Sequence, residues 1–381
     1  MAKEPHSRWK ERGGGTIRVV FAGGGTGGHL FPAIAIAERL VERKNVDLMF
    51  VGTKNKIEAR VVPQLGYKLR TIWIGGFSRN FRVSNFLLPL KIFVSIFQSL
   101  RLLLRFKPQV VVGTGGYVSG PVCAAAVMTR TPIVLQEHNS YPGVMTRMFA
   151  PFAREIHIAF ESSRKYFRKR SNLYISGSPV RKMRKVKRED ALSFFGLNAG
   201  RKTLLVTGGS LGAMSLNGAV LEMVEDIMSR SYQLIWQTGS VDYERVLESC
   251  KTKFDKLQNI EIRKFIERME LAYSAADIAV SRAGATTVAE LVYFSLPALI
   301  VPYPYAAANH QVENALALVD SGAAIMVLES EMKGKFKREL LKLLDNPDEI
   351  ASMREKMKIL QHHDAAAAIA DSVLKIAGEN A

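Results

Sequence analysis

Short apolar runs rich in β-branched residues recur along the chain, and four of them lead into a glycine-rich segment. The run at 17–22 ends in GGGTGGH, and residues 30–40 then show the apolar spacing of a helix. Runs at 110–112, 203–207 and 278–281 lead in the same way into GTGGY, GGSLGA and RAGATT. Strands that alternate with helices in this order predict parallel, doubly wound sheets, so we expect an α/β fold.

The chain length and the spacing of the glycine loops indicate two domains. The chain has 381 residues, and the loops at Gly23 and Gly208 each open a new series of strand, loop and helix. Two Rossmann-like domains that face each other across a cleft fit this repetition. Asp364 is the expected N-cap of a C-terminal helix. The predicted parts are a loose basic tail, a first domain, a second domain and a helix that rejoins the first domain, at residues 1–16, 17–180, 181–363 and 364–380.

The net charge of +18 is concentrated in the first half of the chain. Residues 1–188 contain 33 Lys and Arg against 9 Asp and Glu, whereas residues 189–381 contain 20 against 26. A basic half indicates a polyanion, a membrane surface or nucleic acid as its partner. Cys123 and Cys250 form no CxxC pair or zinc spacing, and the polar N-terminus lacks the apolar core of a secretory signal. We therefore expect a cytoplasmic protein.

Residues 86–104 form the most hydrophobic stretch of the chain. Pro89, Lys91 and Arg101 interrupt it, so a membrane-spanning helix is not expected. Polar residues recur at helical spacing and leave one broad face of Leu, Ile and Phe, which is typical of a helix that lies in a membrane interface. A helix that buries its apolar face on a sheet has the same pattern. The charge of this half favours the membrane, and the sequence leaves both interpretations open.

The segment GGGTGGH at 23–29 satisfies the GxGxxG pattern between a strand and a helix, where a helix N-terminus is able to bind a diphosphate. A nicotinamide dinucleotide site also needs an acid at the end of the second strand. Asp47 has the right separation but begins its strand, and the strand ends in VGTK at 51–54. We therefore interpret the loop as a binding site for a diphosphate or a sugar and expect no nicotinamide cofactor.

A second set of polar groups follows the strands of the predicted second domain. GGSLGA offers backbone amides and the Ser210 hydroxyl at a helix start, which suits a diphosphate. RAGATTVAE at 282–290 opens another helix, and its Glu290 carboxylate is able to accept hydrogen bonds from both hydroxyls of a ribose. The alternative for Glu290 is a solvated acid favoured by the helix dipole. Together these features predict a nucleotide site.

Seven ordered motifs make the chain similar to a known family. They are GGGTGGHLFPAIAIAERL, GTGGYVSGP, QEHN, GSPVR, GGSLGA, RAGATTVAE and HQVENA. Over nearly the whole chain they resemble the GT-B glycosyltransferases that add GlcNAc in peptidoglycan synthesis. The resemblance implies an inverting enzyme that moves GlcNAc from UDP-GlcNAc to the MurNAc C4 hydroxyl of lipid I, the undecaprenyl-diphosphate MurNAc-pentapeptide, and so makes lipid II. It also implies a peripheral location on the cytoplasmic face of the cell membrane, with an anionic membrane surface and cell-wall and division proteins as partners.

The resemblance also implies roles for individual residues. Contacts with the ribose, uracil, diphosphate and GlcNAc of the donor are implied for Thr26, Gly27, Asn139, Arg181, Ser210, Ile266, Ala285, Thr286, Glu290, His310 and Gln311. Contacts with the acceptor are implied for Gly28, His29, Gly115, Gly116 and Tyr117. Three positions depart from the expected pattern: His310 stands where Gln is common, Ser178 stands where Asn is usual, and QEHN replaces HEQN.

Inversion at an anomeric carbon needs a base that takes the proton of the acceptor hydroxyl. His29, which ends the first glycine loop, is the candidate base. The alternatives are a His29 that only hydrogen-bonds a phosphate, and Glu137 as the base. The departing UDP needs cations or fixed dipoles, and the chain has no DxD motif to hold a metal ion. We therefore expect helix-start amides and Arg282 to stabilise UDP, and activity without a bound metal or other cofactor.

Two other functions are open at this point. A related GT-B enzyme that transfers a sugar from a UDP-sugar to diacylglycerol would share the fold and the donor site. A nucleic-acid-binding protein would explain the basic and aromatic stretch at 164–188. Because the chain has no RRM, KH or helix-turn-helix pattern, we expect no nucleic-acid partner.

Overall fold

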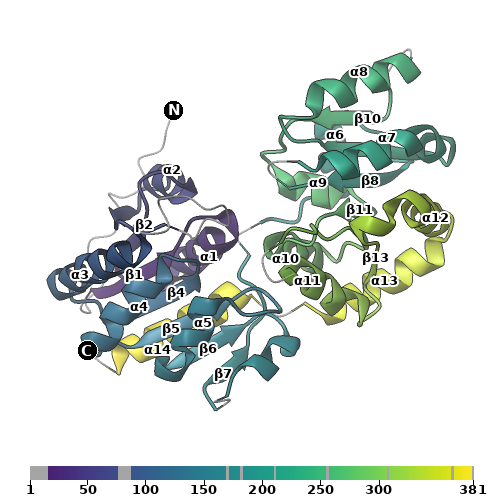
Figure 1. Cartoon of the computed structure of the whole chain (residues 1–381). Coiled ribbons are helices and arrows are strands. Elements are labelled where there is room, and N and C mark those ends of the chain that lie inside the picture. The colour runs from purple at the N-terminus through teal and green to yellow at the C-terminus, as the bar shows by residue number, and fades with distance from the viewer. Residues whose placement is uncertain are drawn as a thin grey trace. The chain divides into compact units, whose positions relative to one another are not determined.

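The chain folds into two compact units, each built on its own parallel sheet (Figure 1). This computed structural model describes residues 16–75, 87–168, 171–180, 183–209, 212–254, 257–306, 309–361 and 364–379. One unit comprises residues 1–181 together with 362–381, and the other comprises 182–361. Nearly all of the predicted tail at 1–16, and the predicted site residues Arg181 and Ser210, lie outside the described residues.

The first unit contains seven parallel strands in the order β3-β2-β1-β4-β5-β6-β7. The strands are β1 (Ile17–Gly23), β2 (Val46–Gly52), β3 (Lys68–Thr71), β4 (Val110–Gly115), β5 (Ile133–Glu137), β6 (Glu155–Ile158) and β7 (Leu173–Ile175). The helices are α1 (Gly27–Arg43), α2 (Ile57–Gln64), α3 (Leu88–Phe106), α4 (Ser119–Met128), α5 (Val144–Phe149) and α14 (Ala365–Gly378), with 3-10 turns η2 (Ala150–Phe152) and η3 (Glu161–Tyr166).

Both faces of this sheet are covered, as expected for strands that are apolar along their whole length. In β1, Val19 and Phe21 belong to a core that includes residues of α1 and α14. Val20 and Ala22 belong to a separate core that includes residues of α4. Because successive side chains of a strand point to opposite faces, β1 contributes to both cores and fixes a helix layer on each side of the sheet.

Helix α14 brings the C-terminal segment back onto the first unit. The Asp364 side chain accepts a hydrogen bond from the Ala367 amide at 3.0 Å, which confirms the predicted N-cap. Ile369 and Val373 are buried in the core that α14 shares with α1. Arg39 of α1 forms an ion pair with Asp364 at 2.6 Å. The end of the chain is therefore part of the first unit's core.

The second unit contains six parallel strands in the order β10-β9-β8-β11-β12-β13. The strands are β8 (Lys202–Thr207), β9 (Tyr232–Gln237), β10 (Ile260–Arg263), β11 (Ile278–Ser281), β12 (Ala298–Ile300) and β13 (Ala324–Met326). The helices are α6 (Arg188–Phe194), α7 (Met214–Ser229), α8 (Tyr243–Lys253), α9 (Met269–Ala275), α10 (Ala285–Phe294), α11 (His310–Val319), α12 (Met332–Leu344) and α13 (Pro347–Ile359), with a 3-10 turn η5 (Glu329–Glu331).

Both sheets have the strand order of doubly wound folds, so the predicted α/β class with two parallel, doubly wound sheets is confirmed. In each sheet the winding direction reverses at one place, between β1 and β4 in the first unit and between β8 and β11 in the second. Loops at the carboxyl ends of such strands diverge, and this is where doubly wound proteins bind ligands. The four glycine-rich segments found in the sequence follow these four strands.

Helix α3 buries a side that contains two serines and leaves much of its apolar face exposed. Its buried residues are Ser95, Ser99 and Leu103, and the helix packs against α4. The Phe93 and Phe97 side chains are 62% and 61% exposed. The interpretation in which this helix buries its broad apolar face on the sheet is therefore wrong. Within the described ranges, every helix is too short or too polar to cross a membrane.

Candidate functional site

The two glycine loops of the first unit pack directly on each other. Gly25, Gly115 and Gly116 have φ of +88°, +95° and +78°. A Cβ on Gly116 would lie 2.6 Å from the Gly24 carbonyl oxygen, and a Cβ on Gly115 would lie 2.7 Å from Nδ1 of His29. Positive φ and the close approach of the two loops therefore require glycine at these positions, independently of any ligand.

His29 is held by β4, the strand that carries the second loop. Its Nδ1 lies 3.1 Å from the Thr114 carbonyl oxygen, and the Thr114 hydroxyl donates to the His29 carbonyl at 2.7 Å. Because a carbonyl oxygen only accepts, Nδ1 carries the proton of the neutral ring and Nε2 carries the lone pair. The His138 ring lies edge-on to the His29 ring, with centroids 5.0 Å apart. This tautomer gives His29 the basic nitrogen that a general base needs.

Glu137 and Asn139 lie at the end of β5, the strand beside β4. One Glu137 oxygen accepts from the Asn139 backbone amide at 3.0 Å, and the other accepts from the Gly143 amide at 2.9 Å. The Asn139 side-chain nitrogen also donates to Glu137, at 3.2 Å. Glu137 therefore organises the turn that presents Asn139. Since both of its oxygens are engaged, it is less suited than His29 to take up a proton.

Tyr117 lies against the first glycine loop. A Cβ on Gly25 would lie 2.8 Å from the Tyr117 ring. Burial, and after it the charge of Glu58, raise the pKa of the Tyr117 hydroxyl, while a hydrogen bond with Thr53 acts in the opposite direction. The phenol is therefore protonated at neutral pH and able to donate a hydrogen bond.

The first unit thus gathers nine predicted site residues at the carboxyl ends of the neighbouring strands β1, β4 and β5. They are Thr26, Gly27, Gly28, His29, Gly115, Gly116, Tyr117, Glu137 and Asn139. Sequence reasoning missed Glu58, whose carboxylate accepts from the Gly25 amide at 2.9 Å. An acid in the first turn of a helix is usually solvated, so the only signal in the sequence was its position shortly after the second strand.

In the second unit, Gln237 joins the loop after β8 to the segment after β10. Its Nε2 donates to the Gly209 carbonyl at 2.9 Å, and its Oε1 accepts from the Ile266 amide at 2.8 Å. Gly212 has φ of +79°, and a Cβ there would lie 2.1 Å from the Thr238 carbonyl oxygen. These contacts fix the positions of Gly209 and Gly212. Ile266 is 1% exposed, so its predicted contact with the uracil lies at a buried residue in this structure.

Helices α7 and α10 begin without an N-cap side chain that accepts a hydrogen bond, since the residues before them are Ala213 and Gly284. Ala285 and Thr286 form the first turn of α10. First-turn amides without a side-chain cap, together with the positive end of the helix dipole, favour an anion. The two helices start after β8 and β11, at the switch point of the second sheet.

Glu290 lies on the second turn of α10 and is 7% exposed. The Tyr273 hydroxyl donates to its carboxylate at 2.9 Å, and the Tyr273 ring stacks on Phe294 with centroids 5.1 Å apart. The interpretation of Glu290 as a solvated acid is therefore wrong. A carboxylate has about four acceptor positions, so Glu290 retains capacity for further donors such as ribose hydroxyls.

His310 and Gln311 begin α11. Oε1 of Gln311 accepts from the Ala283 amide at 3.2 Å and from the Tyr303 amide at 3.0 Å. The side chain thereby joins the loops after β11 and β12, and its Nε2 is the group able to meet a sugar hydroxyl. His310 is half-buried at the helix start.

Arg282 does not have the role that the sequence predicted. Its guanidinium is buried and lies 2.5 Å from the Glu329 carboxylate. It also donates to the Val301 and Pro302 carbonyls, at 3.2 Å each, and to the Ser215 hydroxyl at 3.0 Å. A buried and paired cation of this kind holds loops together, and its charge is already neutralised. The expectation that Arg282 stabilises the departing UDP is therefore wrong.

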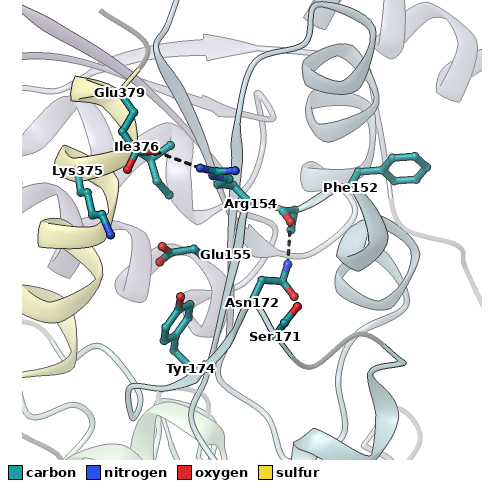
Figure 2. A pocket seen from close by; sticks show the side chains of 10 residues that line it. Phe152, Arg154, Glu155, Ser171, Asn172, Tyr174, Lys375, Ile376 and Glu379 are labelled. Atoms are coloured by element: carbon teal, nitrogen blue, oxygen red, sulfur yellow. Dashed lines mark hydrogen bonds and ion pairs between the residues drawn. The ribbon is translucent and has the colours of Figure 1, made fainter.

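Two cavities of about 450 and 490 Å³ adjoin each other elsewhere in the first unit, between α14 and the strands β6 and β7. Figure 2 shows the first of them, with the ion pair of Arg154 and Glu379 and the hydrogen bond from Asn172 to the Ala153 carbonyl. None of the predicted site residues in the described part of the chain lines either cavity. The described residues also group no three His, Cys, Asp or Glu side chains so as to hold a metal ion.

His157 lines the second cavity and is 4% exposed. Its Nδ1 lies 2.6 Å from the Ser176 hydroxyl, and its Nε2 lies 3.3 Å from the Glu155 carboxylate. Ser372 of α14 donates to the same carboxylate. Burial lowers the pKa of His157 to about 4, against the opposing effect of Glu155. The cluster connects α14 to the edge of the sheet.

Comparison with known proteins shows to which family of enzymes the chain belongs. The N-terminal domain of glycosyltransferase family 28 matches residues 19–158, and the C-terminal domain of that family matches residues 203–369. The chain therefore belongs to glycosyltransferase family 28, and its two sheets are the two domains of such an enzyme.

Individual relatives within this family confirm the predicted resemblance to the glycosyltransferases of peptidoglycan synthesis. A UDP-N-acetylglucosamine--N-acetylmuramyl-(pentapeptide) pyrophosphoryl-undecaprenol N-acetylglucosamine transferase of Prosthecochloris aestuarii is 40% identical over 367 residues, which cover 95% of this chain and 99% of the relative. The enzyme of the same name from Bacteroides fragilis is 37% identical, and the match covers 97% of this chain and 98% of that enzyme. The crystal structure of Acinetobacter baumannii MurG superposes with a TM-score of 0.76 at 26% identity, with 94% and 99% covered. A UDP-GlcNAc 2-epimerase of Neisseria meningitidis shares the fold, with a TM-score of 0.65 at 14% identity and 94% and 100% covered.

Proposed function

We propose that this glycosyltransferase moves GlcNAc from UDP-GlcNAc to the C4 hydroxyl of the MurNAc in lipid I and so forms lipid II. The observation that carries the proposal is the match over 95% of the chain to a relative whose name specifies this donor and this acceptor. Each unit contributes a group of polar residues at the switch point of its sheet, as a two-substrate enzyme needs.

The second unit is the proposed donor half. The buried Glu290 carboxylate, held by the Tyr273 hydroxyl at 2.9 Å, accepts hydrogen bonds from the ribose hydroxyls. The start of α10, at Ala285 and Thr286, and Ser210, which precedes α7 in the sequence, bind the diphosphate. His310 and Nε2 of Gln311 meet GlcNAc hydroxyls. The burial of Glu290 supports its role. No N-cap side chain bonds to the starts of α7 and α10, which supports anion binding there. The Gln311 oxygen accepts from the Tyr303 amide, which leaves its Nε2 to donate to a sugar. Ile266 and Arg181 border the uracil in this proposal.

The first unit is the proposed acceptor half, and His29 is the proposed base. Nε2 of His29 takes the C4 hydroxyl proton while that oxygen forms a bond to C1 of GlcNAc on the face opposite UDP. The bond between C1 and the diphosphate oxygen breaks, and UDP leaves with the bonding electrons, so the anomeric configuration inverts. Support for the role of His29 is its hydrogen bond to Thr114, which leaves the lone pair on Nε2. Gly115 to Tyr117 and the start of α1 bind the acceptor.

We expect this reaction to proceed without a divalent ion. Fixed dipoles at uncapped helix starts stabilise a departing anion without further reorganisation, and the chain carries no DxD motif. Purified enzyme treated with EDTA should therefore retain its activity. Loss of activity that only a divalent cation restores would contradict this part of the proposal.

The exposed face of α3 is the proposed contact with the cytoplasmic surface of the membrane. Phe93 and Phe97 are exposed, and Lys91 and Arg105 lie on the same helix. An interfacial helix combines apolar side chains of this kind with cations that attract anionic lipid. The paired substitutions Phe93→Ser and Phe97→Ser should reduce flotation with anionic vesicles, whereas Ile359→Ser, which removes an exposed apolar side chain from the second unit, should not. Equal flotation of all three proteins would refute the assignment.

One assay tests the reaction as a whole. Purified protein is given labelled UDP-GlcNAc and, in parallel, a lipid I analogue or diacylglycerol. Product from lipid I alone supports the proposal, and the NMR coupling constant of the new anomeric proton checks the configuration of the linkage. Product from diacylglycerol alone would replace the proposal with the related UDP-sugar transferase that the sequence also allows.

A further inference from the structure

Glu58 is a buried carboxylate that the mechanism above does not use. It lies on α2, near the start of the helix, and is 1% exposed. One oxygen accepts from the Gly25 amide at 2.9 Å. The other accepts from the Thr53 amide at 3.0 Å and from the Thr53 hydroxyl at 2.7 Å. Three donors thus converge on one side chain, and every contact requires an acceptor at position 58.

The surrounding backbone is shaped to admit this side chain. A Cβ on Gly24 would lie 2.8 Å from the Glu58 carboxyl carbon, and a Cβ on Gly52 would lie 2.5 Å from Cγ of Glu58. Real Cβ contacts are not this short, so neither position accepts a larger residue while Glu58 stays in place. Gly24 belongs to the first glycine loop and Gly52 ends β2. Glu58 therefore joins the ends of two neighbouring strands.

The Gly25 bond changes how the glycine loop works. In loops of this type, backbone amides at the helix start usually point at the ligand's phosphate. Here the Gly25 amide points instead at a carboxylate of the protein, on the side where Glu58 lies. On another side the loop contacts the Tyr117 ring and the Gly115–Gly116 backbone. The loop is therefore enclosed by the protein's own groups and holds its shape before any ligand binds.

Four residues after Gly25 comes His29, whose ring is aligned by Thr114. The start of α1 is thus fixed at two points, by Glu58 before the helix and by Thr114 at its first turn. We propose that Glu58 is a positioning residue for the acceptor half of the site, which sets the glycine loop and through it His29 and Tyr117 for attack on the donor. This inference rests on the proposed GlcNAc transfer.

The first test is Glu58→Gln. An amide has the same shape as the carboxylate but turns an N–H toward a donor whichever way it is oriented, so either Gly25 or Thr53 loses its partner. A displaced reactive group lowers turnover steeply, and we expect kcat to fall about 10- to 100-fold. UDP affinity should stay within about twofold, because the proposed ribose and uracil contacts of Glu290 and Ile266 belong to the other unit. Arg60→Gln, an exposed change on the same helix, is the matched control and should leave kcat unchanged.

A second variant and a measurement independent of activity guard against a simple folding defect. Glu58→Asp keeps the charge but withdraws the carboxylate by one methylene, so its kcat should lie between those of the wild type and Glu58→Gln. Hydrogen exchange of the peptide that contains Gly25 should become faster in both variants, while the peptides of the second unit should be unaffected.

The proposal is overturned if Glu58→Gln keeps the wild-type kcat, or if it loses kcat and UDP affinity together with a general increase in hydrogen exchange. Wild-type protein that makes no product from lipid I would instead refute the proposed function. In that case exchange at Gly25 still decides whether Glu58 holds the loop.

Discussion

Removal of the Glu290 carboxylate should weaken UDP binding by a predictable amount. A hydrogen bond between a hydroxyl and a charged group contributes about 1.5–3 kcal/mol, so loss of two ribose bonds costs about 3–6 kcal/mol. That corresponds to about 10²- to 10⁴-fold in Kd. The structure favours the lower end of this range, because the carboxylate already accepts from the Tyr273 hydroxyl, which weakens each further hydrogen bond to it. We therefore expect Glu290→Ala to bind UDP about 10²-fold more weakly.

Calorimetry with UDP and with 2′,3′-dideoxy-UDP checks this assignment. The wild type should lose affinity for the dideoxy analogue, whereas Glu290→Ala should bind both compounds equally weakly, because the partner of the missing hydroxyls is already gone. Tyr273→Phe removes only the hydroxyl that holds the carboxylate, and it should cost about 1 kcal/mol, or about fivefold in Kd.

Glu355→Ala, which removes an exposed acid of the same unit, is the matched control and should bind UDP as the wild type does. Glu290→Ala that binds UDP within about threefold of the wild type would refute the ribose assignment. The same conclusion follows if that variant still distinguishes UDP from its dideoxy analogue.

Three further predictions concern the first unit. His29→Ala should lower kcat about 10²- to 10⁴-fold with UDP affinity unchanged, and unchanged turnover would remove His29 as the base. Gly116→Ala should reduce the free energy of unfolding by about 1–3 kcal/mol, seen as a lower urea midpoint, because a Cβ at φ of +78° would lie 2.6 Å from the Gly24 carbonyl. The His157 pKa of about 4 lies below the ordinary value of 6.5, so the unfolded chain binds the extra proton between these values and stability should fall as pH decreases from 6.5 to 4. The free energy of unfolding of the wild type should fall by about 3 kcal/mol over this range, and that of His157→Gln should fall by less. Urea unfolding at several pH values measures both.

Much of the candidate site was visible in the sequence because parallel sheets place loops in a regular way. The glycine segments after 17–22 and 110–112 belong to adjacent strands, and their carboxyl ends must meet at one edge. The same holds for the segments after 203–207 and 278–281. Nine of the predicted residues therefore come together in the first unit, although the sequence alone explained the glycines through a ligand rather than through packing between the loops.

The charged residues show where sequence reasoning fails. Arg282 looked like a free cation beside a phosphate, but Glu329, 47 positions away, neutralises it in a buried site. The sequence also allowed Glu290 to be a solvated acid, but the side chain is buried and bonded to the Tyr273 hydroxyl. Glu58 had the pattern of an ordinary first-turn acid and is instead the acceptor for a loop 33 positions earlier.

The amino-acid sequence by itself determined the strands and helices around the glycine loops and the presence of two parallel sheets, because apolar periodicity, glycine loops and caps such as Asp364 act over a few residues. The tertiary structure alone decided which charged groups bind a ligand and which hold the fold. The reason is physical: the state of a carboxylate or a guanidinium depends on the donors, acceptors and burial around it, and distant segments supply these only once the chain has folded.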